Sequence, residues 1–545
     1  MKKLLLGVGI LFILLVLLVL LVPFLVDLNA YQAQYIPIIE DTLNRKVTLK
    51  DVRLTIWPRI GARVAGFTVL DDPAFSTGTF ASLKSLDVGV KLGPLLQKRV
   101  EVEEITLRDP IITVIKNSDG VMNISTLGKK TAAKPEKPAP APPAEGPLHV
   151  LAMLAVDKVS LKGGRLVYTD QAAKTEYMLQ DLEFLLKSVR LGQSPSLYLA
   201  TTVQPFKLPV KMDGKFGPLE ETADIQNFDF VIGLGKTTLN LKGSAVGGDT
   251  KVTLSSPSIN TAELPVALPL KKPVEVKDVQ MAAELKEPEA TLQNLSFNLF
   301  GGQVKAQGGM TRAAKPSPFH GKVAMQGVQL GPVLDALGTD KVSISGTAST
   351  DLSVAGKGFT KPEMTDALQG TGHLSVKDGK LEGMNLLKEA FALLKAAGIT
   401  QSDVTATVFS VLETDLGIKR GIIMVERLLM DSHDFQATGN GTIGFDQALN
   451  LKLKLNLSEA LSRTIAGTSP MAKLAASDGR ISVPLVISGT AQAPAYALDT
   501  TAMAGKVQEQ VKEKAQEKVR ELLKGKGAGD TPQKPQETLK KLFGQ

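Results

Sequence analysis

The clearest regularity in this 545-residue chain is a strict alternation of leucine with polar residues between positions 449 and 457. Asparagine and lysine fill every position between the leucines. Because successive side chains of a strand point to opposite faces, this pattern predicts a strand with one aliphatic and one polar face. Weaker versions of the pattern occur in segments 99–107, 237–243, 295–302 and 341–349.

Turn signals fit a chain of many strands. Gly-Gly, Asp-Gly and Asn-Gly pairs, which favour hairpins, occur at 163–164, 301–302, 378–379, 440–441 and 478–479. Helical periodicity is confined to 36–44, 382–397, 458–466 and the C-terminal tail. We therefore expect a mainly β fold: a long, largely antiparallel assembly with few helices.

So many one-sided strands raise the question of what covers their aliphatic faces, because the predicted helices are too few. A second sheet, closure into a barrel, or a non-protein apolar partner would each do so. The alternating leucines are the best candidates for contact with lipid, and their packing against another sheet is an equal alternative. These candidates are Leu449, Leu451, Leu453, Leu455 and Leu457.

The N-terminus carries a predicted membrane anchor. Residues Leu4 to Val26 are uncharged and mostly apolar, and a helix of this length spans roughly 30 Å of hydrocarbon. A cleaved secretory signal is the alternative, but the apolar core before Leu28-Asn29-Ala30 is too long for one. Lys2 and Lys3 precede the run, so the positive-inside rule keeps the N-terminus in the cytoplasm and exports the rest of the chain.

Residues suited to catalysis or metal binding are scarce. The chain has no cysteine, which excludes disulfides and thiolate sites, and its four histidines are scattered without metal-ligand spacing. Residues 439–444 fit G-x-G-x-x-G, but they precede the leucine strand rather than a helix, so a hairpin is the better interpretation. We expect no enzymatic activity, no cofactor and no metal.

The net charge of +8 resides at the ends and in one linker. A formally neutral body argues against a nucleic-acid groove, whereas basic ends suit anionic lipid or an acidic partner. The tail predicts an amphipathic helix that caps the body, lies on a membrane or binds a partner. The predicted parts are an anchor (1–26), an N-terminal β module (27–128), an Ala/Pro/Lys-rich linker (129–147), a long β body (148–504) and a charged tail (505–545).

Several motifs recur in the order and spacing of a known family. In the N-terminal module they are Arg45-Lys46-Val47, Leu54-Thr55-Ile56-Trp57-Pro58, Asp72-Pro73-Ala74-Phe75, Gly93-Pro94-Leu95-Leu96, Asp109-Pro110, Asn117-Ser118-Asp119-Gly120 and Asn123. Segments 368–391, 435–445 and 481–499 match near the other end. The chain resembles the AsmA family of envelope proteins of Gram-negative-type bacteria, although that family usually has Gly-Arg in place of Arg45-Lys46 and an aromatic residue after the asparagine.

The resemblance implies an elongated β-sheet rolled into an open groove with an aliphatic lining, as in bridge-like lipid transfer proteins. It also implies an inner-membrane protein with its bulk in the periplasm, active in phospholipid transfer between membranes and in outer-membrane biogenesis. The alternative is a scaffold or assembly factor for outer-membrane proteins that carries no lipid. Expected partners are membrane phospholipid, the inner membrane through residues 4–26, and an outer-membrane or periplasmic protein at the tail. Nucleic acid is not expected.

Overall fold

The computed structural model describes residues 27–128 and 156–501, apart from positions 58, 98, 100, 223, 265–267, 269, 339–342, 383–384, 396–406, 469–475 and 478, and it also describes residue 516. The predicted anchor, the linker and nearly all of the predicted tail helix lie outside these residues. The chain forms two compact units. Unit 1 comprises residues 1–339 and 348–368, and unit 2 comprises residues 340–347 and 369–545.

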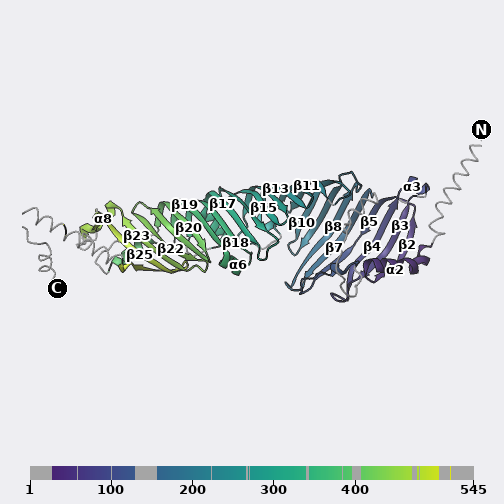
Figure 1. The fold of residues 1–545 in the computed structure, drawn as a ribbon, viewed down its shortest axis with the longest axis horizontal. Helices are drawn as coiled ribbons and strands as arrows, with labels where there is room; N and C mark the ends of the chain where they lie inside the picture. Colours follow the sequence, from purple (N-terminus) through teal and green to yellow (C-terminus); the bar gives the residue numbers. More distant parts are fainter. Residues whose placement is uncertain are drawn as a thin grey trace, which may run out of the picture. The chain divides into compact units, whose positions relative to one another are not determined.

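Unit 1 is a succession of strands with a few short helices (Figure 1). Its strands are β1 (Val47–Thr48), β2 (Asp51–Thr55), β3 (Gly61–Leu70), β4 (Thr79–Val90), β5 (Val102–Arg108), β6 (Ile111–Lys116), β7 (Lys158–Asp170), β8 (Thr175–Lys187), β9 (Ser196–Gln204), β10 (Leu208–Leu219), β11 (Ile225–Leu234), β12 (Thr237–Val246), β13 (Asp249–Asn260), β14 (Glu275–Lys286), β15 (Glu289–Leu299), β16 (Gly302–Thr311) and β17 (Pro318–Gln329). Its helices are η1 (Leu28–Tyr31), α2 (Gln32–Leu43), α3 (Leu92–Leu96), η2 (Asn123–Thr126), η3 (Thr261–Glu263), α5 (Leu330–Leu337) and α6 (Lys361–Ala367).

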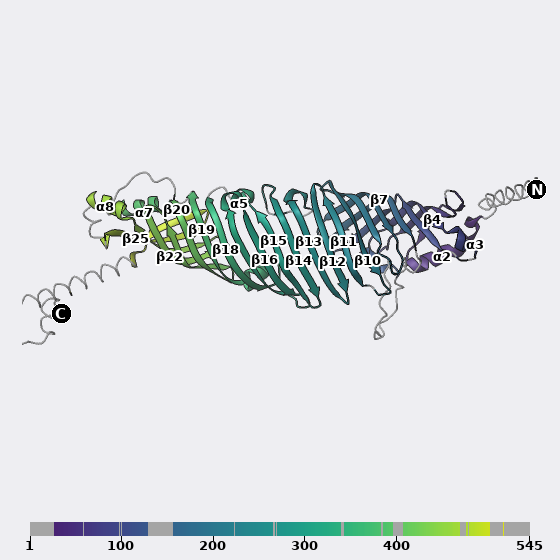
Figure 2. The same ribbon diagram turned by 90° about the horizontal axis from the view of Figure 1, so that it is seen from above.

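From β7 to β17 the strands of unit 1 pair with their neighbours in sequence, and Figure 2 shows β10 to β16 side by side in chain order. Before β7 the order is interrupted, because β1 pairs with β3, β4 with β6 and β5 with β7. Pairing is antiparallel except at β7, which runs parallel to β5 and β6. Strand β7 follows the predicted linker, so the segments on either side of that linker share one sheet. The prediction of a mainly β, largely antiparallel fold is confirmed, with this parallel junction as the part that the sequence did not indicate.

Neighbouring strands at this junction bend at matching positions. Asp109, Gly163 and Asp181 all have positive φ angles, of 47°, 67° and 52°, and the register shifts beside Gly163 and Asp181. Asp109 lies in the connection between β5 and β6, and its amide donates to the Lys162 carbonyl at 2.8 Å, which fixes this connection against the bulge of β7. Bulges increase local twist and bend a strand, so aligned bulges bend adjacent strands together.

Unit 2 is a smaller antiparallel sheet with two helices beside it. Its elements are β19 (Gln369–Glu382), α7 (Leu386–Leu394), β20 (Thr407–Lys419), β21 (Ile422–Asp431), β22 (Phe435–Gly444), β23 (Leu449–Leu457), α8 (Glu459–Thr468), β24 (Ala476–Ser477), β25 (Arg480–Thr490) and β26 (Ala493–Leu498). Strand β18 (Ser343–Lys357) contributes residues to both units. The helices predicted at 36–44, 382–397 and 458–466 correspond to α2, α7 and α8, and the leucine alternation coincides with β23.

Candidate functional site

The pairing register of unit 1 places one row of apolar residues across β2 to β5 and β7 to β17. Residues that are Cα partners in adjacent strands lie on the same face of the sheet. We call this row the apolar strip. It consists of Leu54, Ala62, Val88, Ile105, Val159, Leu186, Leu197, Gly214, Phe230, Leu241, Leu254, Met281, Leu295, Ala306 and Val323.

Between β7 and β11 the apolar strip borders a small core cluster, because Val159, Leu197 and Phe230 pack against buried residues there, but along the rest of its length it is not covered in the way that a protein core is. Apart from Leu186, which is buried, every member is half-buried and keeps part of its surface accessible. Two neighbouring rows widen the strip. One runs through Val52, Val64, Leu86, Leu107, Leu161, Phe184, Leu199, Met212, Ile232 and Leu239. The other runs through Phe216, Phe228, Gly243, Val252, Ala283, Leu292, Gly308 and Gly321.

A bulge in β15 keeps the face apolar where the sequence pattern breaks. Leu292 and Leu295 are three residues apart, which would place them on opposite faces of a regular strand. The register shifts between them, and Gln293 and Asn294 are both exposed. Leu292 pairs with Gly308 and Leu295 with Ala306, so both leucines lie on the apolar side.

From β10 onwards the opposite face of the strands is polar and largely exposed, whereas in β5 and β7 its residues Glu104, Thr106 and Ser160 are polar but buried. In β10 the exposed positions Lys211, Asp213 and Lys215 alternate with half-buried apolar ones. Lys215 is the partner of Asp229 in β11, and Asp229 accepts an ion pair from Lys242 Nζ at 2.9 Å. The apolar strip and its two flanking rows contain no charged residue.

The five sequence-predicted leucines occupy a different environment. Leu449, Leu453, Leu455 and Leu457 are buried, with exposed fractions of 9, 6, 0 and 0%, and Leu451 is half-buried. The sequence left contact with lipid and packing against another sheet as equal alternatives for these residues. The structure places the four buried leucines in a packed core. Their contact with lipid stays a prediction, and the residues of the apolar strip are better placed for it.

The core of unit 2 is continuous across its strands. Leu451, Leu453 and Leu455 pair with Ile487, Leu485 and Val483 of β25, all of which are buried. Helix α8 is fixed to this strand because the Ser462 hydroxyl accepts the Ile481 amide at 3.0 Å. Helix α7 is fixed to β20 because the Leu386 amide donates to Thr407 Oγ1 at 3.0 Å. Burial, with repulsion from Glu389 of α7, raises the pKa of Tyr496 in β26 to about 12.

The motif residues of the N-terminal module converge on a buried polar cluster. Asn123 is fully buried; its amide nitrogen donates to both Asp71 oxygens at 3.0 and 3.2 Å, and its oxygen accepts the Ile115 amide. Arg45 donates to the Asn123 carbonyl at 3.0 Å and to Thr126 Oγ1, which donates to Asp72. The Ala74 amide and the Thr126 hydroxyl hold the pKa of Asp72 below its ordinary value. These interactions join η2 to the start of β1 and give the cluster a structural role.

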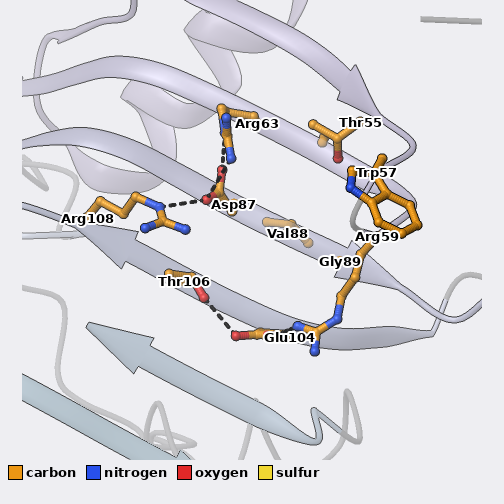
Figure 3. A pocket seen from close by; sticks show the side chains of 11 residues that line it. Thr55, Trp57, Arg59, Arg63, Asp87, Val88, Gly89, Glu104, Thr106 and Arg108 are labelled. Atoms are coloured by element: carbon orange, nitrogen blue, oxygen red, sulfur yellow. Dashed lines mark hydrogen bonds and ion pairs between the residues drawn. The ribbon is translucent and has the colours of Figure 1, made fainter. Parts of the chain in front are cut away.

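A polar cavity of about 150 Å³ lies at the end of β2 to β5 (Figure 3). Asp87 accepts from Arg63 and from Arg108 Nε, the latter at 3.0 Å, and these bonds outweigh burial and hold the pKa of Asp87 below its ordinary value. Glu104 pairs with Arg59 and with Lys158. Each cation here has a carboxylate partner, but Asp87 is shared by two arginines and Glu104 by Arg59 and Lys158.

Within the described residues, no group of three or more histidine, aspartate or glutamate side chains could hold a metal ion. In that same part of the chain, no helix is long and apolar enough to cross a membrane.

The family model described as "AsmA family" matches residues 1–264 and 271–428, so the chain belongs to the AsmA family. The match includes the middle of the chain, where the motifs had shown only a general rhythm of strands, and it ends before segments 435–445 and 481–499. No curated protein and no solved structure matches the chain.

Proposed function

We propose that this protein is an inner-membrane-anchored periplasmic protein that carries phospholipid along the apolar strip of unit 1, in support of outer-membrane biogenesis. The single observation that carries the proposal is an uncharged apolar row on every strand from β2 to β5 and from β7 to β17, half-buried at every position except Leu186. Membership of the AsmA family supports the proposal. The resemblance to that family implies a protein of the cell envelope that acts on lipid.

The proposed mechanism needs no covalent step. Acyl chains would lie along the strip, where burial contributes about 0.8 kcal/mol per methylene without directional bonds, and the head groups would stay in water. Strands lie about 4.8 Å apart, so the strip extends for roughly 70 Å, several times the length of one acyl chain. A lipid could therefore move along it by exchanging one set of aliphatic contacts for an equivalent set.

The test combines lipid analysis with crosslinking in the full chain. The protein is purified in mild detergent and co-purifying phospholipid is measured by mass spectrometry. A photo-crosslinking amino acid is then placed at Leu254, in the strip, and at Thr253, its exposed neighbour on the polar face. Leu455, in the core of unit 2, is the third position.

We expect lipid adducts at Leu254 and none at Thr253 or Leu455. Adducts to other proteins at Leu254, with no phospholipid bound, would overturn the proposal in favour of a scaffold or assembly factor for outer-membrane proteins. Equal lipid labelling at Leu254 and Thr253 would also contradict it, because that result reports detergent-like contact rather than a site.

A further inference from the structure

Large apolar side chains are exposed where unit 1 begins. Trp57 is the sole tryptophan of the chain and its exposed fraction is 88%. Leu96 and Leu92 of α3 are exposed by 78 and 53%. Side chains of this kind are found at the membrane–water interface, where an indole places its ring among the head groups.

The loop with Trp57 and helix α3 lie at the same end of the sheet. Gly61 and Gly89 are Cα partners, and the Val90 amide donates to the Ile60 carbonyl at 2.9 Å. The loop that precedes β3 and the segment that follows β4 are thus neighbours. Figure 3 places Trp57 beside Arg59 at this end, where both line the rim of the polar cavity.

A cation accompanies these apolar groups. Arg99 is exposed, and its guanidinium donates to Gln97 Oε1 at 3.0 Å, while its amide donates to the Pro94 carbonyl at 2.9 Å. Among the described residues it has no carboxylate partner. Arg99 is therefore available for a lipid phosphate next to the two leucines of α3.

The apolar run from Leu4 to Val26 ends immediately before the described structure begins at Asp27. Only Asp27 separates the apolar run from η1, and η1 is fixed to β2. Asn29 donates to Asp51 Oδ1 at 2.9 Å and accepts the Val52 amide at 2.8 Å. The strand that leads to Trp57 is thus held within a few residues of the end of the apolar run.

We infer that Trp57, Leu92, Leu96 and Arg99 form a docking edge that lies against the surface of a phospholipid bilayer. The inference rests on the proposed function in one respect, that residues 4–26 span the membrane. It adds that the first strands of unit 1 touch that same membrane. The start of the apolar strip, at Leu54 in β2, then lies next to the lipid source.

The sole tryptophan makes the test direct. The full chain is reconstituted in nanodiscs of phosphatidylethanolamine and phosphatidylglycerol, with lipids brominated at shallow or deep acyl positions, and Trp57 emission is recorded. We expect a shift to shorter wavelength relative to protein in detergent, and stronger quenching by the shallow bromines. The double variant Trp57→Phe, Val231→Trp moves the fluorophore to an exposed position on the polar face of β11, where quenching should be absent.

Two variants keep the outcomes separate. Leu96→Asp should reduce quenching of Trp57 while leaving the circular dichroism unchanged, because Leu96 is exposed. Leu254→Asp should leave the quenching intact even if it abolishes lipid carriage, so failure of the docking edge and failure of the proposed function are distinguishable. Quenching of Trp57 no greater than that of Trp at position 231 would overturn the inference. Protection of Trp57 from acrylamide without bromolipid quenching would also do so, because it indicates a protein partner.

Discussion

The apolar strip of unit 1 and the leucine strand β23 of unit 2 follow the same rule of register but differ in exposure. In both, apolar Cα partners align across successive strands. In unit 2, α7 and α8 are fixed against the sheet and the row closes into a core. In unit 1, the strip stays half-buried. An apolar face therefore identifies a core only when something within the chain covers it, and the uncovered face is the one available to a ligand.

The largest effect expected from this comparison is on stability. Leu455→Ala should lower the free energy of unfolding of unit 2 by about 2–5 kcal/mol, because it leaves a cavity in a closed core. The matched change Leu254→Ala in the strip should cost roughly 1 kcal/mol or less, because that side chain is already partly exposed. Hydrogen exchange resolved by segment measures both, and equal losses would show that the strip is also a core.

The next effect concerns lipid rather than folding. Leu254→Asp should lower the amount of bound phospholipid about tenfold or more, because an unpaired charge among apolar groups costs at least the 1.4 kcal/mol that corresponds to that factor. The variant should remain folded, since its carboxylate can reach solvent. Thr253→Asp on the polar face is the matched control and should retain its lipid. If both variants lose lipid equally, the strip is not the binding surface.

Acidification should distinguish the units by a smaller margin. In unit 1, backbone amides hold the pKa values of Asp72 and Asp170 below their ordinary values, and cationic partners do so for Asp87 and Asp157 against the effect of burial. Among the described residues of unit 2, the pKa of Asp415 is lowered in this way, by His373 and Arg427. A depressed folded-state pKa contributes stability above the unfolded pKa, near 3.9, that is lost as pH falls through the folded value. Between pH 5 and pH 2, unit 1 should therefore lose more stability than unit 2 in segment-resolved hydrogen exchange. A larger loss in unit 2 would mean that these hydrogen bonds and ion pairs of unit 1 contribute little.

The smallest effect is expected at Leu451, the half-buried leucine of β23. Leu451→Ala should cost about 1 kcal/mol in denaturant unfolding of unit 2, less than Leu455→Ala in the same strand. A photo-crosslinker at Leu451 that captured phospholipid would restore a lipid role to the leucine strand and weaken the contrast between the two units.

The sequence predicted the kind of fold well and the location of the candidate site poorly. The leucine alternation coincides with β23, because a strand that is packed on one face and solvated on the other needs strict period two. For the same reason the most regular pattern of the sequence, the leucine alternation, belongs to a strand of a closed core. The strip is built from one residue per strand, and the bulge at Gln293 and Asn294 breaks the local period, so no single window of sequence reveals it.

Glycine pairs were an uneven guide to turns. Gly301 and Gly479 lie at turns between strands, as predicted, and Gly302 begins β16. Gly163-Gly164, Asp378-Gly379 and Asn440-Gly441 instead lie inside strands. A side chain at position 379 would meet the Phe409 ring at 2.1 Å, so glycine there permits a close approach of the neighbouring strand's ring rather than a turn. Residues 439–444 belong to β22, which pairs with β23 as the predicted hairpin.

The pairing of β7 to β17 in sequence order has a consequence for how such a protein can change its length. Each hairpin extends the strip by roughly 9–10 Å and contributes its own pair of apolar partners. Insertion or loss of a whole hairpin keeps every other register intact, whereas a single-residue insertion inside a strand reverses its faces and introduces polar groups into the strip. The length of the apolar strip can thus change in steps of one hairpin, without any change in the kind of residue that lines it.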